Sequence, residues 1–324
     1  MKLVSSRNLG LDLVRATEAS ALAAGRWMGL DKLDEADEDA AVAMFGILET
    51  LDIDGEIVVG EETRLGKHSP LDSGRKIGTG NGPPLDVVVD PIEGRKLLAQ
   101  GRSGALAVAA VSPLGSLWAP RPAVYMEKIV VNQQVAAALV PECMDAPAAW
   151  TLALVARLKQ KAVRDLVVFV LDRPRHHDLI EEIRRAGARV MLRAAGDVSG
   201  ALLAASDNSR ADILMGIGGM SAGIISACAV RALGGAMLGR LAPQSDEEQA
   251  AVQAAGLDTR RILTTEEMVT SDQVFFAATG VTDGPLLSGV RYHGGRAETH
   301  SLILRGETGT RRLVYAEHAI RATI

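Results

Sequence analysis

The chain has 324 residues, of which 48% are hydrophobic, so it can bury a large core and is long enough to form two lobes. Its formal net charge is −5 and only 3% of its residues are aromatic, which argues against nucleic acid or an anionic membrane surface as a partner. The two cysteines, Cys143 and Cys228, have neither metal-site nor disulfide-framework spacing, and no apolar run reaches the length of a membrane span. We therefore expect an untargeted, cytoplasmic protein.

Two helical patterns come first, followed by short apolar strands. Apolar residues recur at helical spacing over 11–28 and 39–51, and the acidic cluster before the second helix, which includes Asp37, suits a helix start. β-Branched residues predict strands over 56–60 and 85–90, and an apolar run predicts a third over 104–111. The glycine- and proline-rich segment 67–84 is expected to be mainly loop.

The segment 86–96 is the organising element of the chain. Three consecutive valines predict a buried strand that ends on Asp90, and the following proline and glycine predict a rigid corner that holds Asp90 close to Glu93. Two carboxylates held together repel each other, and Mg²⁺ or Mn²⁺ with oxygen ligands is the commonest remedy. A turn in which Asp90 only caps the next helix is the alternative. The preceding strand also ends on carboxylates, the first of which is Glu61.

Strands and helices alternate in the second half of the chain. Helices are expected over 146–161, 177–186 and 200–205, and strands over 166–171, 188–192 and 212–215. This alternation predicts a parallel or mixed sheet covered by helices, and later strands over 273–277 and 301–304 return to the sheets. We expect an N-terminal metal-binding lobe over 1–150 and a C-terminal α/β lobe over 151–324.

Two strand ends in the second lobe are suited to ligand binding. Arg173 and Arg175 follow a buried strand directly, and arginines at such an end suit phosphate, although an exposed basic loop is the alternative. Gly218 belongs to a glycine-rich turn after another strand, where the backbone can approach a ligand or simply turn.

Taken together, these segments resemble the class II fructose-1,6-bisphosphatases, within the lithium-sensitive, metal-dependent sugar and inositol phosphatases. The likeness covers nearly the whole chain in order. It includes Arg15-Ala16-Thr17-Glu18, Val59-Gly60-Glu61, Ile77-Gly78-Thr79-Gly80, Asp90-Pro91-Ile92-Glu93-Gly94, Ala105-Leu106-Ala107-Val108, Tyr125-Met126-Glu127-Lys128, Arg173-Pro174-Arg175-His176, Gly216-Ile217-Gly218-Gly219, Ser271-Asp272 and Ala278-Thr279-Gly280-Val281-Thr282.

The resemblance implies a layered α/β/α/β/α sugar-phosphatase fold and Mn²⁺- or Mg²⁺-dependent removal of the 1-phosphate from fructose 1,6-bisphosphate or a related sugar bisphosphate. The implied metal ligands are Asp37, Glu61, Asp90 and Glu93, and Glu61 and Asp90 would also take part in catalysis. The implied substrate contacts are Tyr125, Arg173, Arg175, Asp197 and Gly218. It also implies a homo-oligomer, a dimer or a tetramer.

Three positions depart from the family pattern. Arg95 replaces a threonine that is thought to orient the attacking water, and arginine cannot relay a proton because it has no acceptor and does not deprotonate. Ala222 replaces a glutamate that completes the metal set, and Ala195 leaves Asp197 as the remaining member of an aspartate pair.

Three hypotheses follow for Arg95. Its guanidinium occupies or electrostatically replaces one metal position beside Asp90, Glu93 and Glu61; it points to solvent; or it clamps the substrate phosphate while catalysis is kept. The first predicts an alternative function, a catalytically silent protein that binds a sugar phosphate or acts as a partner subunit. A dinucleotide-dependent oxidoreductase is a third and weaker reading, because the full glycine fingerprint is absent from the sequence.

Overall fold

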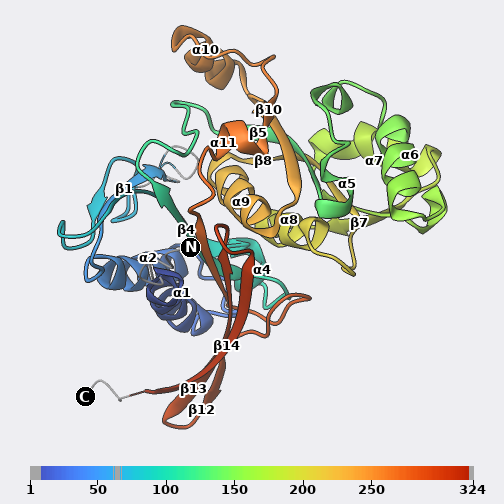
Figure 1. Ribbon diagram of the computed structural model, residues 1–324. Helices are drawn as coiled ribbons and strands as arrows, with labels where there is room; N and C mark the ends of the chain where they lie inside the picture. The colour runs from blue at the N-terminus through green and yellow to red at the C-terminus, as the bar shows by residue number, and fades with distance from the viewer. Residues whose placement is uncertain (1–8, 61, 63–65, 67, 321–324) are drawn as a thin grey trace, which may run out of the picture.

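The computed structural model describes residues 9–60, 62, 66 and 68–320. Their helices and two sheets form five layers in the order α/β/α/β/α (Figure 1). The first sheet contains β1 (Asp54–Val59), β2 (Lys76–Ile77), β3 (Pro84–Glu93), β4 (Leu106–Pro113), β11 (Phe275–Gly280), β12 (Arg291–His293), β13 (Arg296–Arg305) and β14 (Thr310–Ala319). Their order is β12-β13-β11-β4-β3-β1-β2, and β14 also pairs with β13. The predicted α/β class and layered architecture are confirmed.

The second sheet is formed by the middle of the chain. It contains β5 (Tyr125–Val131), β6 (Val167–Leu171), β7 (Arg189–Arg193), β8 (Ile213–Gly219), β9 (Ala236–Leu241) and β10 (Leu263–Thr264), in the order β10-β9-β5-β8-β6-β7. β6 runs parallel to β7 and β8, whereas the other pairs in this sheet are antiparallel. The sequence predicts a parallel or mixed sheet here, and the sheet in the structure is mixed.

Three helix layers separate and cover the sheets. The outer layers are α1 (Leu9–Gly25) with α2 (Leu33–Leu48) on the first sheet, and α5 (Gln133–Ala136), α6 (Ala148–Lys159) and α7 (His177–Arg185) on the second. Between the sheets lie α8 (Asp197–Ala205) and α9 (Met220–Leu233), whose side chains are nearly all buried in the core that both sheets share. Of the other helices in the part of the chain that the structure describes, α4 (Arg95–Ala99), α10 (Asp246–Ala254) and α11 (Thr265–Met268) lie in connections between strands.

A buried row of hydroxyl groups joins α1 to the first sheet. Thr17 Oγ1 lies 2.8 Å from Thr279 Oγ1 of β11, which in turn lies 2.8 Å from Ser301 Oγ of β13. All three residues are fully buried, and each hydroxyl can both donate and accept, so the row satisfies itself without water. It brings the first and last quarters of the chain together.

The organising strand is longer than the sequence predicts. β3 continues through Pro91 to Glu93, although the valine run predicts its end at Asp90. The register against β4 shifts between Asp90 and Glu93, so the proline occupies an irregular position where the ladder is already interrupted. The helix after this corner, α4 (Arg95–Ala99), begins at Arg95, and its N-cap residue is Gly94 rather than Asp90.

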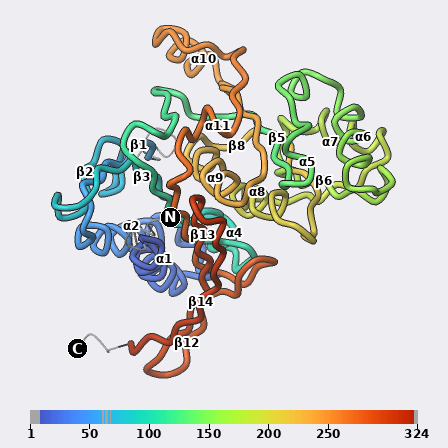
Figure 2. The backbone as a smooth tube through the Cα atoms, viewed as in Figure 1, coloured from blue at the N-terminus to red at the C-terminus, as the bar shows by residue number. Residues whose placement is uncertain are grey.

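The two sheets do not divide the chain at a single point (Figure 2). β5 lies in the second sheet, whereas the last strands, β11 to β14, return to the first, as expected of the strands over 273–277 and 301–304. The division into lobes over 1–150 and 151–324 stays a prediction. None of the described helices combines the length and apolar character that a membrane crossing requires.

Candidate active site

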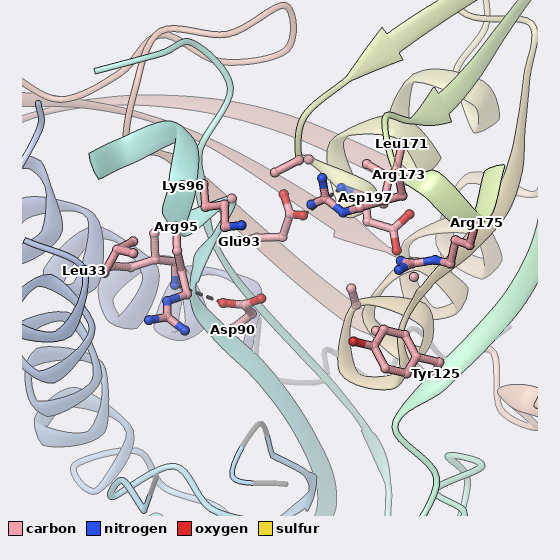
Figure 3. Close-up of a pocket in the computed structure, with 17 residues that line it drawn as sticks. Leu33, Asp90, Glu93, Arg95, Lys96, Tyr125, Leu171, Arg173, Arg175 and Asp197 are labelled. Atoms are coloured by element: carbon pink, nitrogen blue, oxygen red, sulfur yellow. Dashed lines mark hydrogen bonds between the residues drawn. The ribbon is translucent and has the colours of Figure 1, made fainter. Parts of the chain in front are cut away.

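A cavity of about 310 Å³ opens where strand ends of both sheets meet the first turns of α4, α8 and α9 (Figure 3). Open α/β sheets bind ligands at such a place, because backbone N–H groups of helix starts converge there. The cavity is lined by most of the predicted site residues: Asp90, Glu93, Arg95, Tyr125, Arg173, Arg175, Asp197 and Gly218. Asp37 lines an adjoining cavity, which Asp90 and Arg95 also line, and Glu61 lies outside the described residues.

Arg95 forms an ion pair with one of the predicted metal ligands. Its Nη2 lies 2.5 Å from Asp37 Oδ2 and 3.9 Å from Asp34 Oδ1, both on α2. The side chains of Arg95 and Asp37 are each 22% exposed, so solvent screens this pair less than it screens a surface pair. The hypothesis named Asp90, Glu93 and Glu61 as the neighbouring anions; the ion pairs that the structure describes for Arg95 are with Asp37 and Asp34, and Glu61 lies outside the described residues.

Glu93 links the two sides of the cavity. Its Oε1 accepts a hydrogen bond of 2.7 Å from the backbone N–H of Asp197, the first residue of α8. The N-cap residue of α8 is Gly196, which has a φ of 101° and no side chain to cap the helix, so a carboxylate from the other sheet satisfies this N–H. Glu93 is only 5% exposed, and its negative charge complements the helix dipole.

Arg175 and Tyr125 form the opposite wall of the cavity. The Arg175 guanidinium lies over the Tyr125 ring, 5.2 Å from its centroid, and its Nη2 donates to the Ile217 carbonyl at 3.0 Å. Burial lowers the pKa of Arg175 from its ordinary value, and the positive charge of Arg173 lowers it further. An arginine remains protonated under these conditions, so the wall presents a held cation with free donors to an anionic ligand.

His176 anchors the strand end that carries these arginines. Its Nδ1 donates to the Leu171 carbonyl at 2.7 Å, because a carbonyl can only accept. Its Nε2 accepts the Ile217 N–H at 2.8 Å, so the ring is neutral and joins the end of β6 to β8.

We expect His176 to stay neutral below pH 6.5. Burial lowers the pKa of His176, so between the lower folded value and the unfolded value, about 6.5, the unfolded state binds more protons. The contribution of His176 to stability is therefore complete above that window and is lost as the pH falls through it. The ¹⁵N shifts of its ring should show the Nδ1–H tautomer at pH 6.5, and an imidazolium spectrum at that pH would contradict this assignment.

Asp197 is held in place by a buried lysine. Lys128 lies on β5 and is fully buried, and its Nζ donates to Asp197 Oδ2 at 2.6 Å. Gly218 passes close beside this pair, and a Cβ at that position would collide with Asp197 Oδ2 and lie 2.7 Å from Lys128 Nζ. Only glycine therefore fits there. The predicted turn at this glycine-rich segment is wrong, because β8 continues through it to Gly219 in pairing with β5.

Replacing Lys128 by Met is expected to lower the free energy of unfolding by about 3–5 kcal/mol, since it leaves a buried carboxylate without its cation. Urea denaturation would measure the change, and Asp197→Asn on the Lys128→Met background should recover part of it. Lys76→Met removes a lysine from a surface pair with Glu56 and should leave stability almost unchanged. Equal effects of the two lysine variants would contradict the role of the buried pair.

The described residues do not fit a divalent cation at the predicted ligand positions. Asp37 forms an ion pair with the Arg95 guanidinium, and Glu93 accepts a hydrogen bond from the Asp197 N–H at the start of α8. Ala222, which lines the cavity together with Glu93, has no side-chain atom that could bind a metal. Within the described ranges, no three His, Cys, Asp or Glu side chains are arranged as a metal site. Among the residues that the structure describes, four cationic side chains line the cavity, Arg95, Lys96, Arg173 and Arg175, against three acidic ones, Asp90, Glu93 and Asp197.

Comparison with known proteins decides the family. The sequence profile described as "bacterial fructose-1,6-bisphosphatase, glpX-encoded" matches residues 7–318. The chain is 37% identical over 325 aligned positions to fructose-1,6-bisphosphatase 1 class 2 of Escherichia coli K12, which covers 96% of this chain and 95% of that protein. The class 2 enzymes of E. coli O6:H1 and Shigella flexneri match equally well. The chain belongs to the class II fructose-1,6-bisphosphatase family. This family, one of metal-dependent phosphatases, is the one that the sequence resembles.

Sequence reasoning did not assign two residues of this class II site, Lys128 and Lys96. Lys96 lines the cavity beside Arg95, and its place next to the organising corner was a signal that could have found it. Lys128 is followed in β5 by three apolar residues, Ile129 to Val131, and a lysine beside such a run signals a buried partner. The partner, Asp197, is 69 residues away, so the sequence does not reveal the pair.

Proposed function

We propose that this class II family member binds fructose 1,6-bisphosphate or a related sugar bisphosphate in the cavity and turns it over slowly or not at all. The observation that carries the proposal is the ion pair between Arg95 and Asp37. It places a fixed positive charge on a carboxylate that the resemblance assigns to the metal. The ligand expected there is therefore an anion, and cation binding is expected to be weakened.

The two walls of the cavity suit the two phosphates of such a ligand. Arg173 and Arg175 can donate to one phosphate from the strand ends of the second sheet, and Arg95 and Lys96 face it from the start of α4 (Figure 3). Asp197, held by Lys128, can accept from a sugar hydroxyl between them. Tyr125 can pack its ring against the sugar face while it supports Arg175.

Metal-dependent hydrolysis of the 1-phosphate at an altered site is the second candidate function. Family membership supports it, because the class 2 relatives named above are fructose-1,6-bisphosphatases. In this case Arg95 would clamp the transferred phosphate, and Asp90 and Glu61 would keep their catalytic roles. The proposed setting for either function is the cytoplasm.

One pair of measurements tests the proposal. Titration calorimetry with fructose 1,6-bisphosphate should show binding in the absence of divalent cation, with fructose as the uncharged control. Phosphate release should then be followed with 1 mM Mn²⁺ and, separately, Mg²⁺, beside the E. coli class 2 enzyme. Binding with turnover far below that enzyme supports the proposal. Ordinary turnover favours the second candidate, and absence of binding contradicts both.

A further inference from the structure

A second cavity, of about 540 Å³, lies near the start of α5 and the end of α6 (Figure 1). The residues that line it include Asn132, Lys159, Lys161, Asp207 and Asp212. This cavity is separate from the candidate active site, because β5 begins with Tyr125 in that site and ends one residue before Asn132, roughly 20 Å along the strand. Its polar groups therefore take no part in the site described above.

Two lysines hold one carboxylate in the second cavity and form its cationic pole. Asp212 Oδ1 lies 2.7 Å from Lys161 Nζ and 3.2 Å from Lys159 Nζ, and the side chains of Lys159 and Asp212 are only 8% and 5% exposed. Burial raises the pKa of Asp212, but hydrogen bonds from Lys161 and from the Val167 N–H hold it below its ordinary value, so the carboxylate is ionised. The three side chains carry a net charge of +1, and each ammonium has donors beyond the one that it gives to Asp212.

Asn132 and Asp207 form the acceptor pole of the same cavity. Asn132 Nδ2 donates to Asp207 Oδ1 at 2.7 Å, which fixes the orientation of the amide. Asn132 is the N-cap residue of α5, yet its side chain makes no capping bond, and none of the described residues donates to its buried Oδ1. Because a buried acceptor without a donor is unfavourable and Asn132 is only 3% exposed, this oxygen is suited to receive a donor from a bound molecule.

The two poles lie at neighbouring strand ends. The antiparallel pairing of β5 with β8 ends at Val131 and Ile213, and the next residues beyond that pair are Asn132 and Asp212. Residues that face each other across antiparallel strands have Cα atoms about 4.5–5.5 Å apart. A ligand that uses both poles therefore needs a negative and a positive group close together.

We infer that the second cavity binds a free α-amino acid with an uncharged polar side chain. Its carboxylate accepts from Lys159 and Lys161, and its ammonium donates to Asn132 Oδ1 and to Asp207. The two charged groups of an α-amino acid are attached to the same carbon atom, which matches two adjoining poles of opposite charge. The other described residues that line the cavity are polar and uncharged and suit such a side chain: Gln133, Gln134, Asn208 and Ser209.

A simple carboxylate fits this cavity less well than a zwitterion. It would satisfy the two lysines, but it would leave Asn132 Oδ1 without a donor and would add a negative charge near Asp207. The inference is independent of the sugar bisphosphate proposed for the active site, because the two ligands use different residues.

Titration calorimetry tests the class of ligand. The probes are L-glutamine, L-asparagine, L-serine and L-threonine, each at up to 10 mM, and at least one of them should bind to the full-length protein. The N-acetyl derivative of that amino acid lacks the ammonium and its amide lacks the carboxylate, so each should bind at least tenfold more weakly. Absence of binding by all four amino acids, or an N-acetyl derivative that binds equally well, overturns the inference.

Variants test whether the amino acid binds in the second cavity. Lys161→Met and Asn132→Leu should each weaken its binding at least tenfold, and thermal unfolding checks that both variants fold. The Lys161 side chain is 43% exposed, so its replacement should leave the fold intact. Lys76→Met makes the same charge change on the first sheet, and Arg175→Met alters the active-site cavity; both should bind the amino acid as the wild type does. Unchanged binding by Lys161→Met, or an equal loss in either control, overturns the inference.

Discussion

Replacing Arg95 by Thr and Ala222 by Glu together is expected to raise Mn²⁺-dependent phosphate release from fructose 1,6-bisphosphate at least about a hundredfold, ~2.7 kcal/mol in activation free energy. The first change removes the guanidinium from Asp37, 2.5 Å away, and the second adds a carboxylate to the same cavity. Together they lower the local positive charge and introduce the two residue types that the resemblance implies at these positions. Steady-state kinetics with a phosphate sensor would measure the gain.

The control for this experiment removes a different cation from the same cavity. Lys96→Thr with Ala222→Glu changes the net charge equally but leaves the ion pair between Arg95 and Asp37 intact, so it should gain little activity. Calorimetry with Mn²⁺ should show a matching gain in cation affinity for the Arg95 variant alone. Wild-type turnover at the level of the E. coli class 2 enzyme, or an equal gain from both double variants, would contradict the role given to Arg95.

Replacing Arg175 by Met is expected to weaken fructose 1,6-bisphosphate binding about 10- to 100-fold. A charge-assisted hydrogen bond to phosphate contributes about 1.5–3 kcal/mol, and Arg175 is already positioned by Ile217 and Tyr125 before the ligand arrives. The affinity of Arg175→Lys should lie between those of Arg175→Met and the wild type, because lysine keeps the positive charge but lacks the planar pair of donors of arginine. Titration calorimetry without metal would measure all three affinities.

An arginine outside the cavity serves as the matched control for Arg175. Arg185 lies exposed at the end of α7, and Arg185→Met removes the same charge from the same half of the chain. The affinity of the Arg185→Met variant for the sugar bisphosphate should match that of the wild type at moderate ionic strength. If the Arg175 and Arg185 variants lose affinity equally, the effect is one of net charge and the assignment of Arg175 to the ligand is wrong.

Elements with a strong local sequence pattern were predicted, whereas α9 and β14, which lack such a pattern, were not. The helical spacing of apolar residues predicts α1, and the run of β-branched residues predicts β3, whose valines are buried on both faces of the strand. The sequence analysis did not separate out α9, which is buried on nearly all sides between the two sheets and so shows no polar face. It also missed β14, whose polar residues give little apolar signal even though the strand is long and continuous.

The site shows the same limit. The strand ends that carry Asp90, Arg173 and Arg175 could be predicted because glycine, proline and charge mark them locally. The partners of these residues could not, since the hydrogen bond from the Asp197 N–H to Glu93 and the ion pair from Lys128 to Asp197 join segments 104 and 69 residues apart. Family resemblance nominated Asp37 as a metal ligand, and only the coordinates show the guanidinium on it.

The sheet topology sets an order for folding during synthesis. All six strands of the second sheet come from one continuous stretch, 125–264. In the first sheet, by contrast, β11 lies between β4 and β13, so β4 cannot pair on that side until the last 50 residues of the chain have been made. We therefore expect the second sheet to form on the ribosome while β1 to β4 of the first sheet are still waiting for the C-terminal strands to be synthesised. During that interval the edge of β4 that β11 later covers is expected to stay unpaired, and an unpaired apolar strand edge favours aggregation.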